Sequence, residues 1–409
     1  MLPEPPLHQT SPLAQIEMIP VNGHDMTEVA ICAVARTPIG KFRGSYAGYS
    51  AVELGIFAVE ELLKRAGLAA DSGLVDEVIF GQVLQAGAGQ APARQVTLGA
   101  GLPDSTPAVT INKVCGSSLK AVMMAANSIR AGEYRCIIAG GMESMTNAPK
   151  MQLERDGDLV NSMIHDGLWD VYNDVHMGNT GESVSLEYDI SRETADAFAF
   201  RSQQKAAVAE KNGWFAWESF PVPLPDGSEL TYDEGVRDGT TAESLGELKS
   251  AFIAEGRVTA GNASTLSDGA SAVLVVEANF ARQQGWDIIA LIEDYCTSGL
   301  APVQVMSAPI PAVNTLLERN DLSVEQVDIF EHNEAFAAAS CAVAKEVGIP
   351  DEKFNLHGGA VALGHPLGSS GSRCLITMLG VMRRVEASNG IVTLCLGGGN
   401  AVAMLVKRV

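Results

Sequence analysis

INKVCGSSLKAVMMAANSIR, residues 111–130, predicts the end of a strand, a sharp turn at Cys115 and then an amphipathic helix. Apolar residues recur at helical spacing from Leu119 to Ile129, and Ser117 is a favourable residue at a helix start. Cys115 would therefore lie at the positive end of a helix, where unpaired N–H groups favour a thiolate and a nucleophilic thiol near neutral pH. A buried structural cysteine is the alternative that this stretch leaves open.

The order of elements around this stretch recurs at the end of the chain. In the first part, we predict strands at Val29–Val34, Val75–Val83, Ala108–Asn112 and Cys136–Ala139, the last ended by Gly140-Gly141, and helices at Ala51–Ala66 and Ala91–Leu98. In the last part, we predict helices at Ala312–Arg319, Phe336–Val347 and Gly368–Met382, and strands at Val327–Glu331 and Ile391–Leu396. Two similar strand–helix units predict two α/β halves that face one another by pseudo-symmetry.

A different region separates the two halves. Residues 142–266 hold charge-rich loops, helices such as Ser191–Lys211 and few strand signals. We interpret this region as an inserted loop domain that covers a site or makes subunit contacts. The predicted organisation is a flexible extension over residues 1–27, a first half over 28–141 completed by about 267–286, the insertion over 142–266 and a second half over 287–409.

Composition narrows the class of protein. The chain has 409 residues, 46% hydrophobic residues and 41 glycines, which suits a globular α/β enzyme. Its net charge of −21 argues against nucleic acid as a partner. The sequence contains no run of about 18 apolar residues, so we predict no membrane span. Seven cysteines without CxxC spacing predict neither a zinc site nor a disulfide framework, so we expect a cytoplasmic protein.

Four stretches carry the residues that could do chemistry. They are the turn at Cys115, NEAFA at 333–337, HGGAVALGHPLG at 357–368 and CLGGG at 395–399. Each lies just beyond a predicted strand end or at a helix start, where an α/β fold gathers its ligand site. One glycine-rich run is a weak signal, whereas the four stretches together predict one site.

His365 is the candidate base for Cys115. Gly364 and Pro366 flank it, so the backbone can be approached closely and the loop is fixed. A neutral imidazole can take the proton from a cysteine thiol. A structural histidine is the alternative.

Cys395 is a candidate second acid or base, because a thiol whose pKa is near neutral can remove and return a proton. The glycines after it would leave backbone N–H groups for a developing oxyanion. Asn333 could orient a water molecule or donate to an oxyanion. A buried cysteine at a strand end and a turn-forming asparagine are the alternatives.

The sequence resembles the thiolases, the family of acetyl-CoA acetyltransferases and 3-ketoacyl-CoA thiolases. The resemblance covers about Glu28–Val409 in family order and rests on six stretches: VARTPIGKFRGSYAG, INKVCGSSLKAV, VTAGNASTLSDGASA, NEAFA, GGAVALGHPLGSSGSR and CLGGGNA. It implies the α/β thiolase fold, in which two pseudo-symmetric halves stack as α-β-α-β-α layers with a large inserted loop domain.

The resemblance also implies a ping-pong exchange of acyl groups between coenzyme A thioesters, with no bound metal or cofactor. Cys115 would be acylated, and His365 would activate it. With a water held by Asn333, His365 would also bind the thioester oxygen of the second substrate. Cys395 would take the α-proton of that substrate in condensation to acetoacetyl-CoA, or protonate the leaving enolate in thiolysis. The N–H groups of Cys115 and Gly397 would form the second oxyanion hole.

By the same resemblance, the insertion binds coenzyme A. The implied contacts are Arg237 at the nucleotide, Ser244 and Ser264 at the adenine and pantetheine portions, His176 and Met177 along the pantetheine and acyl channel, and Phe336 and Met306 at the acyl pocket. Acyl-CoA and CoA would be the only ligands, the assembly a homodimer or homotetramer, and the setting fatty acid metabolism.

Departures from the family pattern leave the acyl chain length open. His357 stands where thiolases commonly have Asn, and Gly181 where they commonly have Ala. We expect His357 to add a hydrogen bond near the site. Four other readings are a thiolase of longer chain preference, a decarboxylating condensing enzyme, which would not need Cys395, and a non-catalytic acyl-CoA-binding subunit, in which the four chemical positions would be eroded. The fourth is a cysteine hydrolase using Cys115, His365 and Asn333, which would not explain Cys395 or the doubled fold.

Overall fold

The structure is a computed structural model that describes residues 27–409. The predicted flexible extension over residues 1–27 lies outside the described residues, apart from Thr27. Within the described range, no helix combines the length and the hydropathy needed to cross a membrane.

One mixed sheet of ten strands organises the described chain, in the order β14-β15-β16-β13-β1-β12-β5-β3-β4, with β2 paired to the start of β12. Its strands are β1 (Val29–Arg36), β2 (Gly40–Lys41), β3 (Glu77–Gly81), β4 (Ala108–Ile111), β5 (Cys136–Ser144), β12 (Ser267–Glu277), β13 (Ala290–Gly299), β14 (Ile329–His332), β15 (Asn389–Leu396) and β16 (Asn400–Arg408). The β3–β4, β3–β5 and β14–β15 pairs are parallel, whereas the pairs that involve β1, β12, β13 or β16 are antiparallel.

The sheet consists of two halves that repeat one another. From the junction outward, one half runs β1-β12-β5-β3-β4 and the other runs β13-β16-β15-β14. The halves join through only two residue pairs between β1 and β13, Ala30 with Leu291 and Ile31 with Ala290. The predicted pseudo-symmetry of two α/β halves is therefore confirmed.

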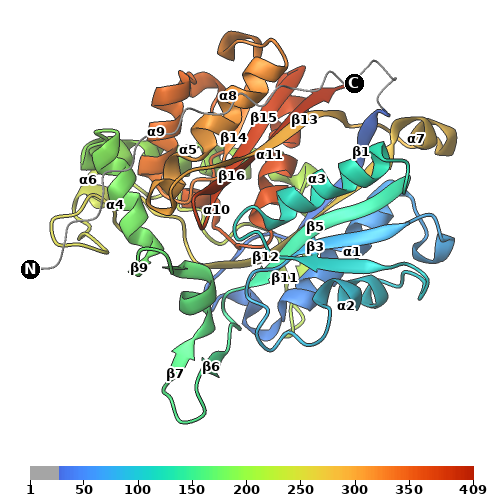
Figure 1. Ribbon diagram of the computed structural model, residues 1–409, viewed down its shortest axis with the longest axis horizontal. Helices are drawn as coiled ribbons and strands as arrows, with labels where there is room; N and C mark the ends of the chain where they lie inside the picture. Colours follow the sequence, from blue (N-terminus) through green and yellow to red (C-terminus); the bar gives the residue numbers. More distant parts are fainter. Residues whose placement is uncertain (1–26) are drawn as a thin grey trace, which may run out of the picture.

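Helices form three layers around these halves (Figure 1). The helices outside the insertion are α1 (Ala51–Ala66), α2 (Pro92–Gly99), α3 (Ser117–Arg130), α7 (Ala278–Gln284), α8 (Pro309–Arg319), α9 (Ala337–Val347), α10 (Ala360–Leu363) and α11 (Ser370–Val385). Helices α3 and α11 fill the central layer, whereas α1 and α2 cover the outer face of the first half and α8 and α9 that of the second. The implied α-β-α-β-α layering is present.

Strand β1 contributes side chains to two hydrophobic cores, one on each face of the sheet. Ile31 points into the central core and Ala30 and Cys32 into the outer one, because successive side chains of a strand face opposite sides. Strands covered on both faces read as continuous apolar runs. For this reason β12 and β16, which the sequence analysis did not single out, carry no alternation that would have identified them. Strand β13, which was also not predicted, has half-buried and exposed residues along most of its length.

The predicted end of β5 at Gly140-Gly141 is wrong, because the strand continues to Ser144 along β12. A Cβ atom on Gly140 would lie 2.1 Å from the carbonyl oxygen of Ser271, and one on Gly141 would lie 2.0 Å from that of Gly368. These glycines therefore allow close approach of other backbone segments, and they do not end the strand.

The segment between β5 and β12 holds three helices and three short hairpins. Their bounds are β6 (Lys150–Gln152), β7 (Leu159–Asn161), β8 (Trp169–Asp170), β9 (Val175–His176), α4 (Met177–Glu187), α5 (Arg192–Lys211), β10 (Val222–Pro223), β11 (Glu229–Leu230) and α6 (Ala242–Gly246). The β6–β7 hairpin projects from the body of the molecule (Figure 1). A single π-helical turn, Met163–Leu168, leads into β8.

Candidate active site

Cys115 lies on a strained turn between β4 and α3. The residue before it, Val114, has φ of +46°, a conformation that β-branched residues rarely adopt. The Ser117 hydroxyl holds this turn by accepting from the N–H of Lys113 at 2.8 Å and donating to the carbonyl of Val114 at 2.7 Å. Asn112 accepts from the N–H of Val114 at 2.9 Å. Ser117 thus fixes the turn, and the helix N-cap is Gly116 without a side-chain cap.

His365 lies in the loop between α10 and α11. Its backbone N–H donates to the hydroxyl of Ser267 and to the carbonyl of Thr265, both at 3.1 Å. Its Nδ1 lies 2.6 Å from the Ser370 hydroxyl at the start of α11. Burial and the charge of Arg373 lower the pKa of His365 to about 3, so the imidazole is neutral at ordinary pH.

Asn333 follows β14 and lies directly behind His365. Its Nδ2 is 3.4 Å from Nε2 of His365, and its Oδ1 is 3.8 Å from Sγ of Cys374. Asn333 is fully buried, and its own N–H donates to the carbonyl of Thr393 on β15. The side chain is therefore held from two sides.

Cys395 lies near the end of β15, before the turn that leads into β16. Its Sγ is 3.7 Å from Sδ of Met306. Gly398 and Gly399 have φ of +83° and +81°, so this turn needs residues without a Cβ atom. At Gly399 the Cβ would also lie 2.3 Å from the carbonyl oxygen of Leu300.

One cavity of about 60 Å³ brings these turns together. It is lined by Cys115, His365, Cys395 and Gly397, and by Val114, Gly167, Leu168, Met177, Ser264, Val305, Met306, Ala335, Phe336, Leu367 and Leu396. Three of the four predicted catalytic residues therefore share a single cavity, and Asn333 reaches it through His365.

The cavity continues into a larger channel of about 540 Å³. Met177, Ser264 and Phe336 line both spaces, and His176 lines the channel, where its ring stacks on that of Phe252 with centroids 4.9 Å apart. Met306 lines the cavity as well. Five of the seven predicted ligand contacts therefore line the cavity or the channel.

Arg237 and Ser244 lie apart from the cavity and the channel. Both side chains are exposed, and neither residue lines either space. The backbone N–H of Arg237 donates to Gln203, and the Ser244 hydroxyl accepts from the N–H of Thr241 in the capping box of α6. Elsewhere in residues 27–409, no group of three or more His, Cys, Asp or Glu side chains could hold a metal ion.

The expectation of a thiolate at Cys115 in the free protein is wrong. Burial raises the pKa of the Cys115 thiol above its ordinary range, and the nearby Cys395 adds to the rise. Burial also raises the pKa of Cys395 to about 12, against the expectation of a value near neutral. This effect of burial outweighs that of the helix start. A thiol with a raised pKa needs a base to become a nucleophile.

Glu143 is a residue that the sequence analysis missed. It is fully buried on β5, and its carboxylate accepts from three backbone N–H groups, those of Val83, Leu84 and Gly368, at 2.9 to 3.2 Å. Burial raises its pKa to about 7. Glu143 thus ties the loop after β3 to the segment that follows His365. In the sequence, an acidic residue within an apolar strand was the feature that could have identified Glu143.

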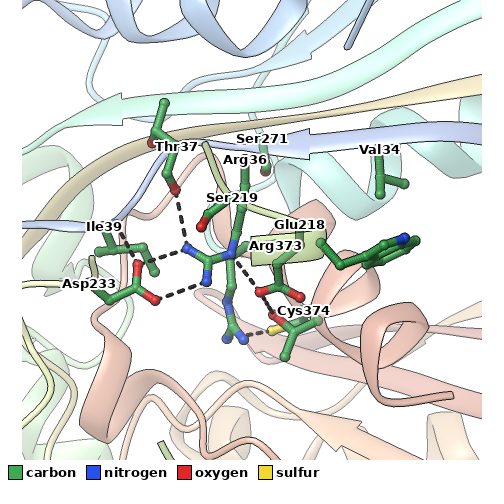
Figure 2. A network of polar contacts seen from close by, with 12 residues as sticks. Val34, Arg36, Thr37, Ile39, Glu218, Ser219, Asp233, Ser271, Arg373 and Cys374 are labelled. Carbon is green, nitrogen blue, oxygen red and sulfur yellow. Dashed lines mark hydrogen bonds and ion pairs between the residues drawn. The ribbon is translucent and has the colours of Figure 1, made fainter. Parts of the chain in front are cut away.

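A buried ionic network lies behind the site (Figure 2). Arg36 donates from Nε to Glu218 at 2.7 Å and from its two terminal nitrogens to Asp233 at 2.7 and 2.9 Å. Arg373 contacts Cys374 at 2.9 Å, and Cys374 reaches Asn333. This network anchors the segment between β5 and β12 to β1 and extends to the residue that holds His365.

His357 does not contribute to the site, contrary to expectation. It lines neither the cavity nor the channel. Its Nε2 accepts from Nε of Arg384 at 2.9 Å, and its ring stacks on Trp214 at 5.2 Å between centroids. The position therefore serves packing between α11 and the 3-10 turn Trp214–Trp217 that follows α5, where burial lowers the pKa of His357 to about 3.

Comparison with known proteins agrees with this geometry. The family model described as "Thiolase, N-terminal domain" matches residues 29–279, and "Thiolase, C-terminal domain" matches residues 286–408. The chain is 48% identical to proteins named acetyl-CoA acetyltransferase from Pseudomonas aeruginosa and from Cupriavidus necator, over 94% of this chain and 100% of each relative. It is 44% identical to a probable acetyl-CoA acyltransferase of Staphylococcus aureus, again over 94% of this chain and 100% of the relative.

Proposed function

The chain belongs to the thiolase family and is an acyltransferase that acts on acyl-CoA, and from this premise we propose how its residues carry the reaction. The observation that carries the proposal is the single cavity of about 60 Å³ lined by Cys115, His365 and Cys395. Each of these residues comes from a different turn, and two of the three are thiols. A hydrolase with one thiol and one imidazole would leave Cys395 unexplained.

In the first half-reaction, the Cys115 sulfur attacks the thioester carbon of an acyl-CoA. The Cys115 proton passes to Nε2 of His365, whose low pKa keeps the imidazole neutral and able to accept it. The C–S bond to CoA breaks, the CoA sulfur takes the proton from His365, and the acyl group stays on Cys115 as a thioester.

In the second half-reaction, Cys395 handles the α-proton of the second acyl-CoA. In condensation, Cys395 first gives its proton to Nε2 of His365, and the resulting thiolate removes the α-proton. The carbanion attacks the acyl carbon on Cys115, the C–S bond to Cys115 breaks as the carbon–carbon bond forms, and the Cys115 sulfur takes the proton from His365. In thiolysis, Cys115 gives its proton to His365 and attacks the 3-keto carbon, the carbon–carbon bond breaks, and the Cys395 thiol protonates the enolate that leaves and regains a proton from His365. The same residues therefore serve both directions.

Two oxyanion sites would stabilise these steps. We assign the first to Nε2 of His365, which can donate once it has taken a proton from a thiol, with a water held by Asn333, and the second to the backbone N–H groups of Cys115 and Gly397. Within residues 27–409, neither of these N–H groups donates to another residue, which supports their assignment to a substrate oxygen. Removal of one such donor from an enzyme typically costs about 2.7 to 4 kcal/mol of transition-state stabilisation.

The preferred acyl groups are short in this proposal. The buried side chains of Met306 and Phe336 bound a cavity of only about 60 Å³, which suits an acetyl or acetoacetyl group better than a long chain. The relatives named acetyl-CoA acetyltransferase support the same substrate class.

Coenzyme A would occupy the channel of about 540 Å³ with its pantetheine portion. His176, Met177 and Ser264 would border it, and the exposed Arg237 and Ser244 of the segment 142–266 would meet the nucleotide. CoA thioesters are then the only ligands of the reaction, with no resident cofactor. We further propose a homodimer or homotetramer in the cytoplasm.

Mass spectrometry tests the nucleophile. After incubation with acetyl-CoA, we expect one acetyl group on the intact protein, located on the peptide that holds Cys115. The C115A variant should carry none and should lose thiolysis of acetoacetyl-CoA while keeping its circular dichroism spectrum. An acetyl adduct of equal yield in C115A would contradict the assignment.

A further inference from the structure

The hydroxyl of Ser370 lies between Nδ1 of His365 and the carbonyl oxygen of Pro366. Ser370 Oγ donates to the carbonyl oxygen of Pro366, four residues earlier, at 2.8 Å. The same oxygen lies 2.6 Å from Nδ1 of His365. A serine hydroxyl has one hydrogen and two lone pairs, so an oxygen that donates to Pro366 can only accept from the imidazole.

We propose that Ser370 is a positioning residue that holds His365 as the Nδ1–H tautomer and so keeps the Nε2 lone pair free for the Cys115 proton. The role rests on the function proposed above, in which His365 is the base. It differs from that proposal because Ser370 contacts neither thiol and lines neither the cavity nor the channel.

The other contact of the ring agrees with this tautomer. Nδ2 of Asn333, an N–H donor, lies 3.4 Å from Nε2 of His365. A donor opposite Nε2 requires a lone pair there, and the acceptor opposite Nδ1 requires a proton there. The two neighbours of the ring therefore select the same tautomer from opposite sides.

The need for such a residue follows from burial. His365 is only 6% exposed, and Ser370 is fully buried. In the cavity that His365 shares with Cys115, an Nε2–H imidazole would offer a second donor where an acceptor is required. At metal-ligating histidines, groups that hold the other ring nitrogen typically contribute about 10-fold to 100-fold to affinity or activity, and we expect an effect of the same order here.

The test is the S370A variant, with S372A as the matched control. Ser372 is a buried serine two residues further along α11, and its hydroxyl contacts Ser271 at 2.6 Å. Two readouts are compared: the tautomer of His365, from two-bond proton–nitrogen NMR correlations of protein labelled with ¹⁵N-histidine, and the rate constant for acetylation of Cys115 in a single turnover. The His365 signal is assigned from its loss in H365N.

In the wild type we expect His365 to show a protonated Nδ1 and an unprotonated Nε2. In S370A we expect a mixed or reversed tautomer and an acetylation rate constant that is lower by about 10-fold or more, while S372A keeps both values. S370T, which restores the hydroxyl, should recover the wild-type tautomer.

A wild-type His365 protonated at Nε2, or an S370A variant with unchanged tautomer and rate, would overturn the proposal. The wild-type spectrum alone decides this if S370A fails to fold. If Cys115 of the wild type is not acetylated although Nδ1 is protonated, the proposed function fails and the assignment of the tautomer stands.

Discussion

The hydroxyl of Ser118 on α3 accepts a hydrogen bond from the backbone N–H of Ser372 on α11 at 2.9 Å. The first helix begins just after Cys115 and the second just after His365, so this bond fixes the two helix starts to one another across the central layer. The close approach depends on Gly371, where a Cβ atom would lie 2.4 Å from the backbone nitrogen of Leu119. The active site is thus assembled where the two halves of the fold cross.

Loss of the second thiol should separate the two half-reactions. In C395A, acetyl-CoA should still acetylate Cys115, because His365 and the other residues that line the cavity remain. Condensation and thiolysis should fall by at least about 100-fold, because proton transfer by a positioned group contributes about 10²-fold to 10⁴-fold. Intact-mass analysis measures the first step, and release of CoA measures the whole cycle.

A control for this variant is C341A, whose thiol lies on α9 and lines neither the cavity nor the channel. It should keep both activities. Normal turnover in C395A would remove Cys395 from the mechanism.

The acetylation step should depend weakly on pH between 5.5 and 8. The pKa of His365 is lowered to about 3, so the imidazole stays neutral as the pH falls through this window. An imidazole with the ordinary pKa of about 6.5 would lose about 10-fold of its neutral form at pH 5.5. Burial raises the pKa of the Cys115 thiol above its ordinary range, so the reacting form up to pH 8 is the protonated thiol that gives its proton to His365, and the population of that form stays constant toward pH 8. Rapid-quench mass spectrometry measures this rate constant, and a 10-fold decline per pH unit below 6.5 would exclude a depressed pKa.

The sequence predicts those parts of the fold and site that depend on local patterns. The apolar spacing in α1 and α3 identifies these helices, and the glycine-rich turns near His365 and Cys395 identify segments that meet at one cavity, because neighbours in the chain determine such patterns. Strands β12 and β16 were not predicted because burial on both faces removes the alternation of apolar and polar residues. The pKa values of the thiols and the role of Glu143 depend on segments far away in the sequence, and no local pattern carries that information.

The buried ion pairs of Arg36 should contribute strongly to the free energy of unfolding (Figure 2). In R36A, the carboxylates of Glu218 and Asp233 lose their shared cation while buried, which typically costs about 3 to 5 kcal/mol. Guanidinium denaturation followed by circular dichroism measures the free energy of unfolding.

The matched control is R282A. Arg282 pairs with Glu28 at 2.9 Å on the surface, with about half of each side chain exposed. An exposed pair typically contributes about 0 to 1 kcal/mol, so R282A should change little. Equal losses in the two variants would contradict the importance of burial in this network.

Met306 should set the limit on acyl chain length. Its side chain is 3% exposed and touches Cys395, so it closes the cavity of about 60 Å³ on that side. In M306A, the space released should accept two further methylene groups, each worth about 0.8 kcal/mol when buried. The ratio of kcat/KM for 3-ketohexanoyl-CoA to that for acetoacetyl-CoA should therefore rise by about 10-fold. The volume-conserving M306L should keep the wild-type ratio, which separates the effect of space from that of losing sulfur beside Cys395. An unchanged ratio in M306A, with both substrates slowed equally, would show that another wall of the cavity selects the chain length.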